Sequence, residues 1–261
     1  SNAMPIFTFN YLPGNRYNNV KLVIYQYPST TNTKVELFTG QMNIALHDLE
    51  QKIDSKCSVE NKIFQHMLSY MAHKKKTPTK NYEFVNNTSM KVSISAAILW
   101  IILDPTHSWI AKFRPRVDQL QLINRLKLNR VVYDQHEALS ALIDFKSNKQ
   151  TIEILGHILK NEHYYFGVRQ HAARLLGLYC SPNSDYDHLE VLIGFYEERC
   201  QQRQSSSTVA NQELANHLVQ IETIKAISVV RDQQNITPTT VVNKIDSIIN
   251  RTFSSNFAFT D

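Results

Sequence analysis

The stretch ILWIILDP, residues 98–105, separates two parts of the chain that differ in their apolar spacing. Its first six residues are apolar without alternation, which indicates a strand that is buried on both faces or one that ends against a neighbouring domain. Asp104 and Pro105 end the run, because turn residues and proline break a strand pattern. Strand-like runs precede this stretch and helical spacing follows it, so the sequence predicts a multi-domain chain with β and α parts.

The part before this stretch is typical of a β-sandwich. Short runs rich in β-branched and aromatic residues occur at 20–27, 34–38, 41–47, 81–85, 90–94 and 98–103. In the third run Met42, Ile44 and Leu46 share one face, as the period of two in a strand requires. Six or more short strands favour a sandwich or a small barrel, and we expect an antiparallel β-sandwich domain over residues 4–115. Residues 1–3, Ser-Asn-Ala, are expected to be the remnant of an affinity tag.

After Pro115 the apolar residues follow the 3.6-residue period of helices. Apolar stripes recur at about 118–132, 138–143, 152–159, 168–179, 189–196, 214–224 and 242–249. Asp134 and Glu137 have the spacing of a capping box, which is expected to open the second helix. Antiparallel pairs of such helices predict an α-solenoid of the HEAT or ARM type over residues 116–261.

The composition suits a chain with buried cores. With 43% hydrophobic and 20% charged residues, the 261-residue chain has enough apolar surface for two cores. The apolar run at residues 98–103 is far shorter than the roughly 20 residues that span a bilayer, so we expect no membrane partner. Three widely spaced cysteines, an odd number, indicate a reducing compartment, the cytosol or the nucleus.

Positive charge is concentrated in one segment. Between residues 74 and 130, eleven Lys and Arg stand against three acidic residues, a balance of +8, whereas the whole chain carries +5. Clustered positive charge can neutralise phosphates or bind an acidic partner, and it can also simply keep a surface solvated. These readings stay open. The candidate residues for binding a nucleic acid or an acidic partner are Lys74, Lys75, Lys76, Arg114, Arg116, Arg125, Lys127 and Arg130.

No pattern of catalytic residues emerges from the sequence. His136 and Glu137 begin the His-Glu-x-x-His pattern of zinc peptidases, but Ser140 stands where the second histidine is needed. Six glycines leave little room for phosphate-binding loops, and none of the common ones is present. We therefore expect no catalytic residue, no metal site, no cofactor and no small-molecule substrate. Arg169 and Arg174 are expected to pair with neighbouring acids or carbonyls.

Several of these residues together resemble the TFIID subunit 2 family. Residues 99–105 look like the tryptophan and Asp-Pro junction that closes the β-sandwich in that family, and residues 74–76 sit where the family carries a lysine-rich loop. The residues of the helical part that fall in the family's order and nearly its spacing are Leu126, Arg130, Gln135, Glu137, Ala141, Leu142, Phe145, Tyr164, Tyr165, Val168, Arg169 and Ala172. The similarity covers roughly residues 18–180.

The resemblance implies an architecture borrowed from gluzincin aminopeptidases, in which a β-sandwich and a helical superhelix follow a peptidase-like lobe. It also implies a nuclear scaffold without catalysis, which acts within TFIID during assembly of the pre-initiation complex. Its implied partners are other TBP-associated factors and core-promoter DNA. Two alternatives stay open: the same domains of an active aminopeptidase whose zinc domain precedes them, and a scaffold unrelated to transcription. An upstream His-Glu-x-x-His helix would identify the first alternative.

Overall fold

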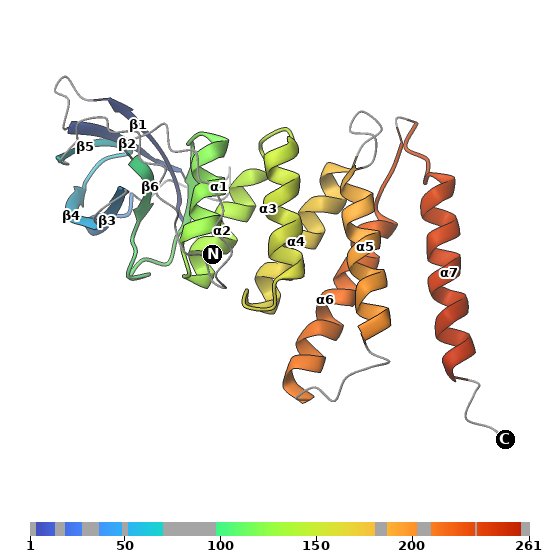
Figure 1. Cartoon of the computed structure of the whole chain (residues 1–261). Coiled ribbons are helices and arrows are strands. Elements are labelled where there is room, and N and C mark those ends of the chain that lie inside the picture. The colour runs from blue at the N-terminus through green and yellow to red at the C-terminus, as the bar shows by residue number, and fades with distance from the viewer. Residues whose placement is uncertain are drawn as a thin grey trace, which may run out of the picture. The chain divides into compact units, whose positions relative to one another are not determined.

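The computed structural model describes residues 4–13, 19–27, 37–48, 52–69, 98–180, 187–202, 210–232 and 234–256. The chain divides into two compact units, Ser1–Leu142 and Ile143–Asp261. In the described residues the first unit contains strands β1 to β7 and helices α1 and α2, and the second contains helices α3 to α7 (Figure 1). The change from strands to helices after Pro115 is confirmed.

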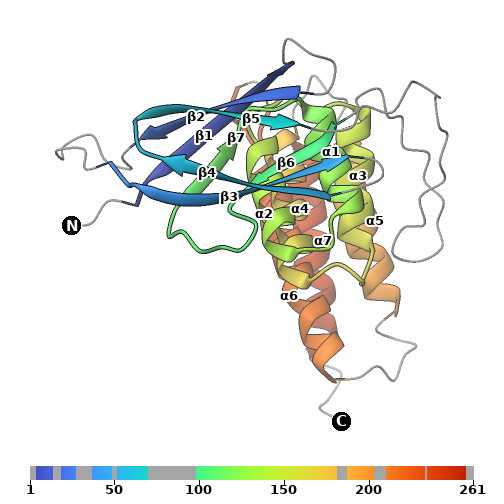
Figure 2. The same ribbon diagram turned by 90° about the vertical axis from the view of Figure 1, so that its left-hand side faces the viewer.

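The strands of the first unit form two sheets, which lie in separate layers (Figure 2). One sheet has the order β5-β2-β1-β7, with β1 at Ile6–Pro13, β2 at Asn19–Tyr27, β5 at Ile63–Ser69 and β7 at Lys112–Pro115. The other has the order β4-β3-β6, with β3 at Gly40–Asp48, β4 at Lys52–Val59 and β6 at Ile98–Leu103.

The expectation of an antiparallel sandwich needs one correction, because β7 runs parallel to β1. The other described strand pairs are antiparallel, as hairpin connections favour. β7 instead reaches its sheet by crossing over from β6 in the other layer, so no hairpin dictates its direction. Of the expected strands, those at 81–85 and 90–94 lie outside the described residues. In the run at 34–38, residues 37 and 38 are not in a strand, and the rest lies outside the description.

The core of the sandwich lies between the two sheets. Phe7, Leu22 and Ile24 from one sheet pack with Ile44 and Leu46 from the other, and all are fully buried or nearly so. Burial of such side chains contributes about 1.5–3 kcal/mol each relative to exposure. Apolar residues at alternate positions of paired strands therefore hold the layers together.

β6 is buried on both faces, which is one of the two readings that its sequence left open. Ile98, Ile101 and Leu103 face the inter-sheet core, whereas Leu99, Trp100 and Ile102 form a second apolar cluster on the outer face. Leu128, at the end of α1, packs against that second cluster. A register irregularity beside His47 and Asp48 accompanies the departure of β6 from simple alternation.

Helices α1 (Gln119–Leu128) and α2 (Val132–Leu142) pack against each other and against the strands. α1 contacts β6, and α2 contacts β7. Both helices thus belong to the compact unit that contains the sheets. The expected domain boundary between residues 115 and 116 stays a prediction about folding units.

The second unit contains α3 (Lys149–Lys160), α4 (Phe166–Tyr179), α5 (Asp187–Gln202), α6 (Ala210–Ser228) and α7 (Thr239–Asn256). α3 contacts α4 and α5, α6 contacts α4 and α5, and α7 contacts α6. α4 and α6 approach closely at Gly177, where an added Cβ would lie 2.5 Å from the carbonyl oxygen of Ala226. None of the described helices combines the length and apolar surface that a bilayer-spanning segment needs.

Candidate interaction surface

The loop after β6 is organised by Asp104, which is fully buried and has a positive φ of 50°. Its carboxylate accepts hydrogen bonds from the Trp109 backbone N–H at 2.7 Å and from Thr106 Oγ1 at 3.1 Å. Its own N–H donates to the carbonyl of Asn43 in β3 at 2.7 Å. Asp104 therefore fixes the turn that carries the chain from one sheet to the other, which accounts for the Asp-Pro junction in the sequence.

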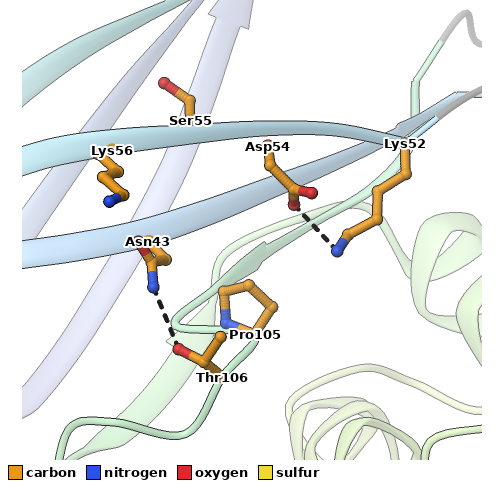
Figure 3. A pocket seen from close by; sticks show the side chains of 7 residues that line it. All are labelled: Asn43, Lys52, Asp54, Ser55, Lys56, Pro105 and Thr106. Atoms are coloured by element: carbon orange, nitrogen blue, oxygen red, sulfur yellow. Dashed lines mark hydrogen bonds and ion pairs between the residues drawn. The ribbon is translucent and has the colours of Figure 1, made fainter.

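A shallow pocket of about 420 Å³ lies beside this loop (Figure 3). Its lining residues are Asn43, Lys52, Asp54, Ser55, Lys56, Pro105 and Thr106. Lys52 and Asp54 form an ion pair at 2.9 Å, and Asn43 Nδ2 donates to Thr106 Oγ1 at 3.2 Å (Figure 3). These groups pair with one another rather than converge on a point in the pocket, so the pocket offers no arrangement typical of a catalytic centre.

Arg125, one of the predicted binding residues, is buried, with only 2% of its surface exposed. Its guanidinium donates to Glu137 and lies 3.1 Å from Asp134 Oδ1. Asp134 also accepts a hydrogen bond from Asn129 Nδ2 at 2.7 Å. Burial raises the pKa of Glu137, and the positive charge of Arg125 opposes that rise. Arg125 thus links α1 to α2 from within the protein, and a partner has no access to it.

The same network corrects the interpretation of Asp134 and Glu137 as a capping box. α2 begins at Val132, so Asp134 lies in the first helical turn rather than at the cap. Both carboxylates form ion pairs with Arg125 rather than cap the N-terminus of the helix. Residues three apart on a helix share one face, so the spacing that suits a capping box also suits two ligands for one guanidinium.

The structure separates the remaining candidate residues. Arg114 and Arg116 are exposed at the end of β7 and just after it, and Arg130 is exposed between α1 and α2. Lys127 lies on α1 and is half-buried. Residues 74–76 lie outside the described part of the chain. Arg114 therefore lies in β7 and Arg116 directly follows it, and the structure gives them neighbours that the sequence did not reveal.

Those neighbours are on the outer face of the β5-β2-β1-β7 sheet. The parallel pairing of β1 with β7 places Arg114 opposite Thr8, and Thr8 lies opposite Tyr25 of β2. Lys112 and Lys21 are on the same face, since they alternate with residues that point into the core. The alternation of residues 20–27 could have indicated that Lys21 and Tyr25 share an outward face. No feature of the sequence indicated that β7 would pair with β1.

Other predicted or considered residues have structural partners. Arg169 is buried and donates to the Leu159 carbonyl at 3.0 Å and to Asn216 at 2.8 Å. Arg174 pairs with Glu222 at 2.8 Å, so the pairing predicted for both arginines is confirmed. Ser140, which stands in place of a second zinc-binding histidine, donates to the carbonyl of His136. Within the described ranges, no three His, Cys, Asp or Glu side chains lie close enough to hold a metal ion.

Two stacked sheets with helices on an outer face define the class, an Ig-like β-sandwich joined to helices. Residues 2–117 match the family model described as the TAF2 Ig-like domain.

The relatives extend this match beyond the sandwich. The chain is 26% identical over 171 residues to transcription initiation factor TFIID subunit 2 of Schizosaccharomyces pombe (strain 972 / ATCC 24843). This alignment covers 63% of this chain and 14% of that protein. The chain is also 26% identical to TFIID subunit 2 of Danio rerio, over 60% of this chain, and of Gallus gallus, over 59%, again with 14% of each relative covered. The chain thus spans about a seventh of these relatives, and the matches confirm the resemblance seen in the sequence.

A solved structure shares the fold. It is the crystal structure of Legionella pneumophila aminopeptidase A in complex with aspartic acid, with a TM-score of 0.52 and 10% sequence identity. The likeness covers 85% of this chain and 27% of that one. At this identity the comparison concerns architecture alone, and the expected aminopeptidase-type architecture agrees with it.

Proposed function

We propose that this chain is a non-catalytic scaffold segment of a TFIID subunit, which acts in the nucleus through contacts with other TFIID subunits during assembly of the pre-initiation complex. The observation that carries the proposal is the match of residues 2–117 to the TAF2 Ig-like domain. The alignments to TFIID subunit 2 are longer than this domain, so they include helical residues as well.

The helices of the second unit support a HEAT-like solenoid as the scaffold element. α3 contacts α5 and α4 contacts α6, so helices two apart in the chain adjoin each other, as they do when helix pairs stack. In a solenoid each pair leaves apolar surface that a neighbouring pair covers. Such a stack presents long helical faces to partner proteins, which is the physical basis for a scaffold role.

The proposal is tested by using the full chain as bait in a nuclear extract and measuring named TFIID subunits by quantitative mass spectrometry. An Ig-like sandwich of similar size and isoelectric point is the control bait. We expect TFIID subunits to be enriched on this chain over the control. Equal recovery on both baits would contradict the proposal.

Contact with promoter DNA is a separate part of the proposal, for which Arg114, Arg116 and Arg130 are exposed. Binding by charge alone falls as salt rises, with a logarithmic slope of about 0.9 per phosphate contacted. We expect weak binding of duplex DNA with little sequence preference, and a flatter slope after Arg114→Gln and Arg116→Gln. A slope unaffected by these changes, or no binding at low salt, would remove DNA from the list of partners.

The alternative reading, an active aminopeptidase, rests on the fold likeness. That likeness has 10% identity, whereas the curated relatives are TFIID subunits. The sequence of the whole protein distinguishes the two readings, because an active gluzincin requires a His-Glu-x-x-His helix upstream.

A further inference from the structure

The outer face of the β5-β2-β1-β7 sheet carries exposed apolar side chains on β5, which form its apolar margin, and basic side chains on and just after β7, which form its basic margin. Lys21 of β2 lies between them, opposite Met67. We call this outer face the basic-apolar face and define it by Lys21, Ile63, Met67, Lys112, Arg114 and Arg116. These positions alternate with residues of the inter-sheet core, such as Leu22, Phe64, Leu68 and Phe113. Period-two alternation therefore directs them away from the core.

Strand register orders these side chains across the face. Ile63 of β5 lies opposite Tyr25, Tyr25 lies opposite Thr8, and Thr8 lies opposite Arg114. Neighbouring strands are about 4.8 Å apart, so three steps separate the apolar and basic margins by roughly 14 Å. That span is wider than one extended strand and close to the roughly 10–12 Å diameter of an α-helix with its side chains.

The apolar margin is exposed to an extent that is unusual for large side chains. Ile63 is 52% exposed and Met67 is 51% exposed, both on β5 at one end of the strand order. Tyr27 of β2 is also exposed, and its ring stacks with that of Tyr25 at 6.4 Å between centroids. A cluster of large apolar side chains beside an edge strand is typical of an interaction surface.

The basic margin has no acidic counterpart on its own sheet. Strands β1, β2, β5 and β7 contain no Asp or Glu. Within the described residues, Lys112, Arg114 and Arg116 of this margin have no ion-pair partner, nor does Lys21 opposite Met67, whereas Lys52 and Arg174 elsewhere do. A patch of one sign attracts a partner of the opposite sign.

The two outer faces of the sandwich also differ in cover. On the β4-β3-β6 sheet, Trp100 and its neighbours are buried under Leu128 of α1. On the β5-β2-β1-β7 sheet, Ile63, Met67 and Arg114 remain exposed. The sandwich thus covers one apolar outer face with its own helix, whereas on the basic-apolar face the two margins are exposed and Thr8 and Val23 between them are buried.

We infer that the basic-apolar face docks an acidic protein segment whose apolar side chains contact Ile63 and Met67 while its carboxylates face Lys112, Arg114 and Arg116. Charge complementarity selects an acidic partner, and the exposed aliphatic residues select a protein over a nucleic acid. A duplex phosphate backbone that contacts the basic margin would leave Ile63 and Met67, roughly 14 Å away across the sheet, without contacts. The inference deepens the proposed function, because it names the chemistry of one scaffold partner.

The test measures binding of the full chain to a fluorescent synthetic peptide that contains Asp, Glu, Leu and Phe in an amphipathic order. A control peptide replaces Asp by Asn and Glu by Gln. Two variants each remove one margin of the face. The basic-margin variant combines Lys112→Gln, Arg114→Gln and Arg116→Gln, and the apolar-margin variant combines Ile63→Ser and Met67→Ser. The matched control, Lys56→Gln with Lys149→Gln and Arg231→Gln, removes the same number of exposed charges elsewhere. Near-unchanged thermal unfolding would show that each variant is folded.

We expect each margin variant to weaken binding of the acidic peptide about tenfold, and the matched control to change it by less than about twofold. The neutral peptide should bind as weakly as the acidic peptide does to the basic-margin variant. The inference is overturned by absence of peptide binding at low salt or by equal binding to all variants. It is also overturned if duplex DNA binds this face, responds to the basic margin alone and excludes the peptide.

The same variants separate this inference from the proposed function. If TFIID subunits are recovered equally on the wild-type chain and on both margin variants, the basic-apolar face is not a docking surface, but the scaffold role stands. If no TFIID subunit is enriched even on the wild-type chain, the proposed function fails, and peptide binding then describes the face alone.

Discussion

At the residue scale, the buried ion network of Arg125 shows how a basic residue can be misassigned to a surface. Asp134 and Glu137, its partners, lie nine and twelve positions further along the chain in another helix. No local spacing in the sequence indicates that two helices will bring them together. Arg125 is buried because of the tertiary packing of α1 against α2. The sequence alone therefore could not show that Arg125 is inaccessible to phosphate.

Arg125→Met should destabilise the first unit by about 3–5 kcal/mol, because it leaves two buried carboxylates without a counter-charge. Both tryptophans, Trp100 and Trp109, lie in that unit, so the midpoint of urea unfolding followed by tryptophan fluorescence measures it selectively. Arg130→Met is the matched control, since Arg130 is exposed on the loop that follows α1, and it should change stability by less than about 0.5 kcal/mol. Equal effects of the two changes would contradict the structural role of Arg125.

His47 should make the first unit less stable in mild acid. It stacks on Trp100 at 4.9 Å between ring centroids, and burial, followed by the charge of Lys52, lowers its pKa below 6.5. The unfolded chain therefore binds a proton more readily, so stability falls as the pH drops below about 6.5 towards the folded pKa.

The measurement is the difference in urea midpoint between pH 7.5 and pH 5.5, again followed by tryptophan fluorescence. His47→Gln should reduce that difference, and His66 and His136, whose pKa values burial also lowers, contribute in the same direction, whereas Glu137, whose pKa burial raises, contributes in the opposite one. His163→Gln, in the other unit, should leave the difference unchanged. A pH dependence that is the same in His47→Gln as in the wild type would rule out this role of His47.

At the element scale, the close approach of α4 and α6 depends on one missing side chain. Gly177→Ala would place a Cβ 2.5 Å from the Ala226 carbonyl oxygen, and a backbone atom cannot move aside as a flexible side chain would. We expect a loss of about 1–3 kcal/mol in the second unit, measured by circular dichroism at 222 nm during urea unfolding.

Gly194→Ala is the matched control, because Gly194 is also helical and has no atom within 4 Å of its added Cβ. It should be neutral or stabilise the helix by up to about 1 kcal/mol, the difference in helix propensity. If both substitutions stabilised the protein, α4 and α6 would have to be further apart than described.

Most elements with a strong local pattern were predicted from the sequence, whereas β4 and β7, which lack one, were not. The helices after residue 118 and the strands β2, β3 and β6 carry long apolar stripes or runs, which the sequence revealed. β4, KIDSKCSV, carries many polar residues, and β7 has four residues that include a proline. β1 was missed although IFTFNYLP alternates, and the run at 34–38 was expected in a region where residues 37 and 38 form no strand.

The candidate surface was predictable only in part, for a physical reason. Arg114 and Arg116 were identified by local charge, but their apolar neighbours come from β5, about 50 positions earlier, through pairings that run across β1 and β2. Pairing between distant strands is set by packing of the whole sandwich rather than by local sequence. The charge pattern of the sequence therefore identified the basic margin of the surface, whereas the apolar margin was found only in the structure.

At the scale of the whole molecule, two boundaries for the first domain compete. The change from strands to helices places it between residues 115 and 116, whereas the compact unit ends at Leu142. The cluster of Leu99, Trp100 and Ile102 favours the boundary at Leu142, because Leu128 of α1 packs against it. Without α1 these side chains would lose their cover on an open sheet face, at about 25 cal/mol for each Å² of apolar surface exposed.

We therefore expect a fragment of residues 4–142 to unfold cooperatively, and a fragment of residues 4–115 to be less stable and to bind the dye ANS. A Trp109→Phe background leaves Trp100 as the fluorescent reporter, and its emission should shift to longer wavelength in the shorter fragment. Trp100→Ser in the shorter fragment removes one of the large apolar side chains that α1 would cover, so it should reduce ANS binding there. If both fragments unfolded with the same urea midpoint and neither bound ANS, the boundary after residue 115 would be the correct one, and α1 and α2 would act as the first pair of the helical part.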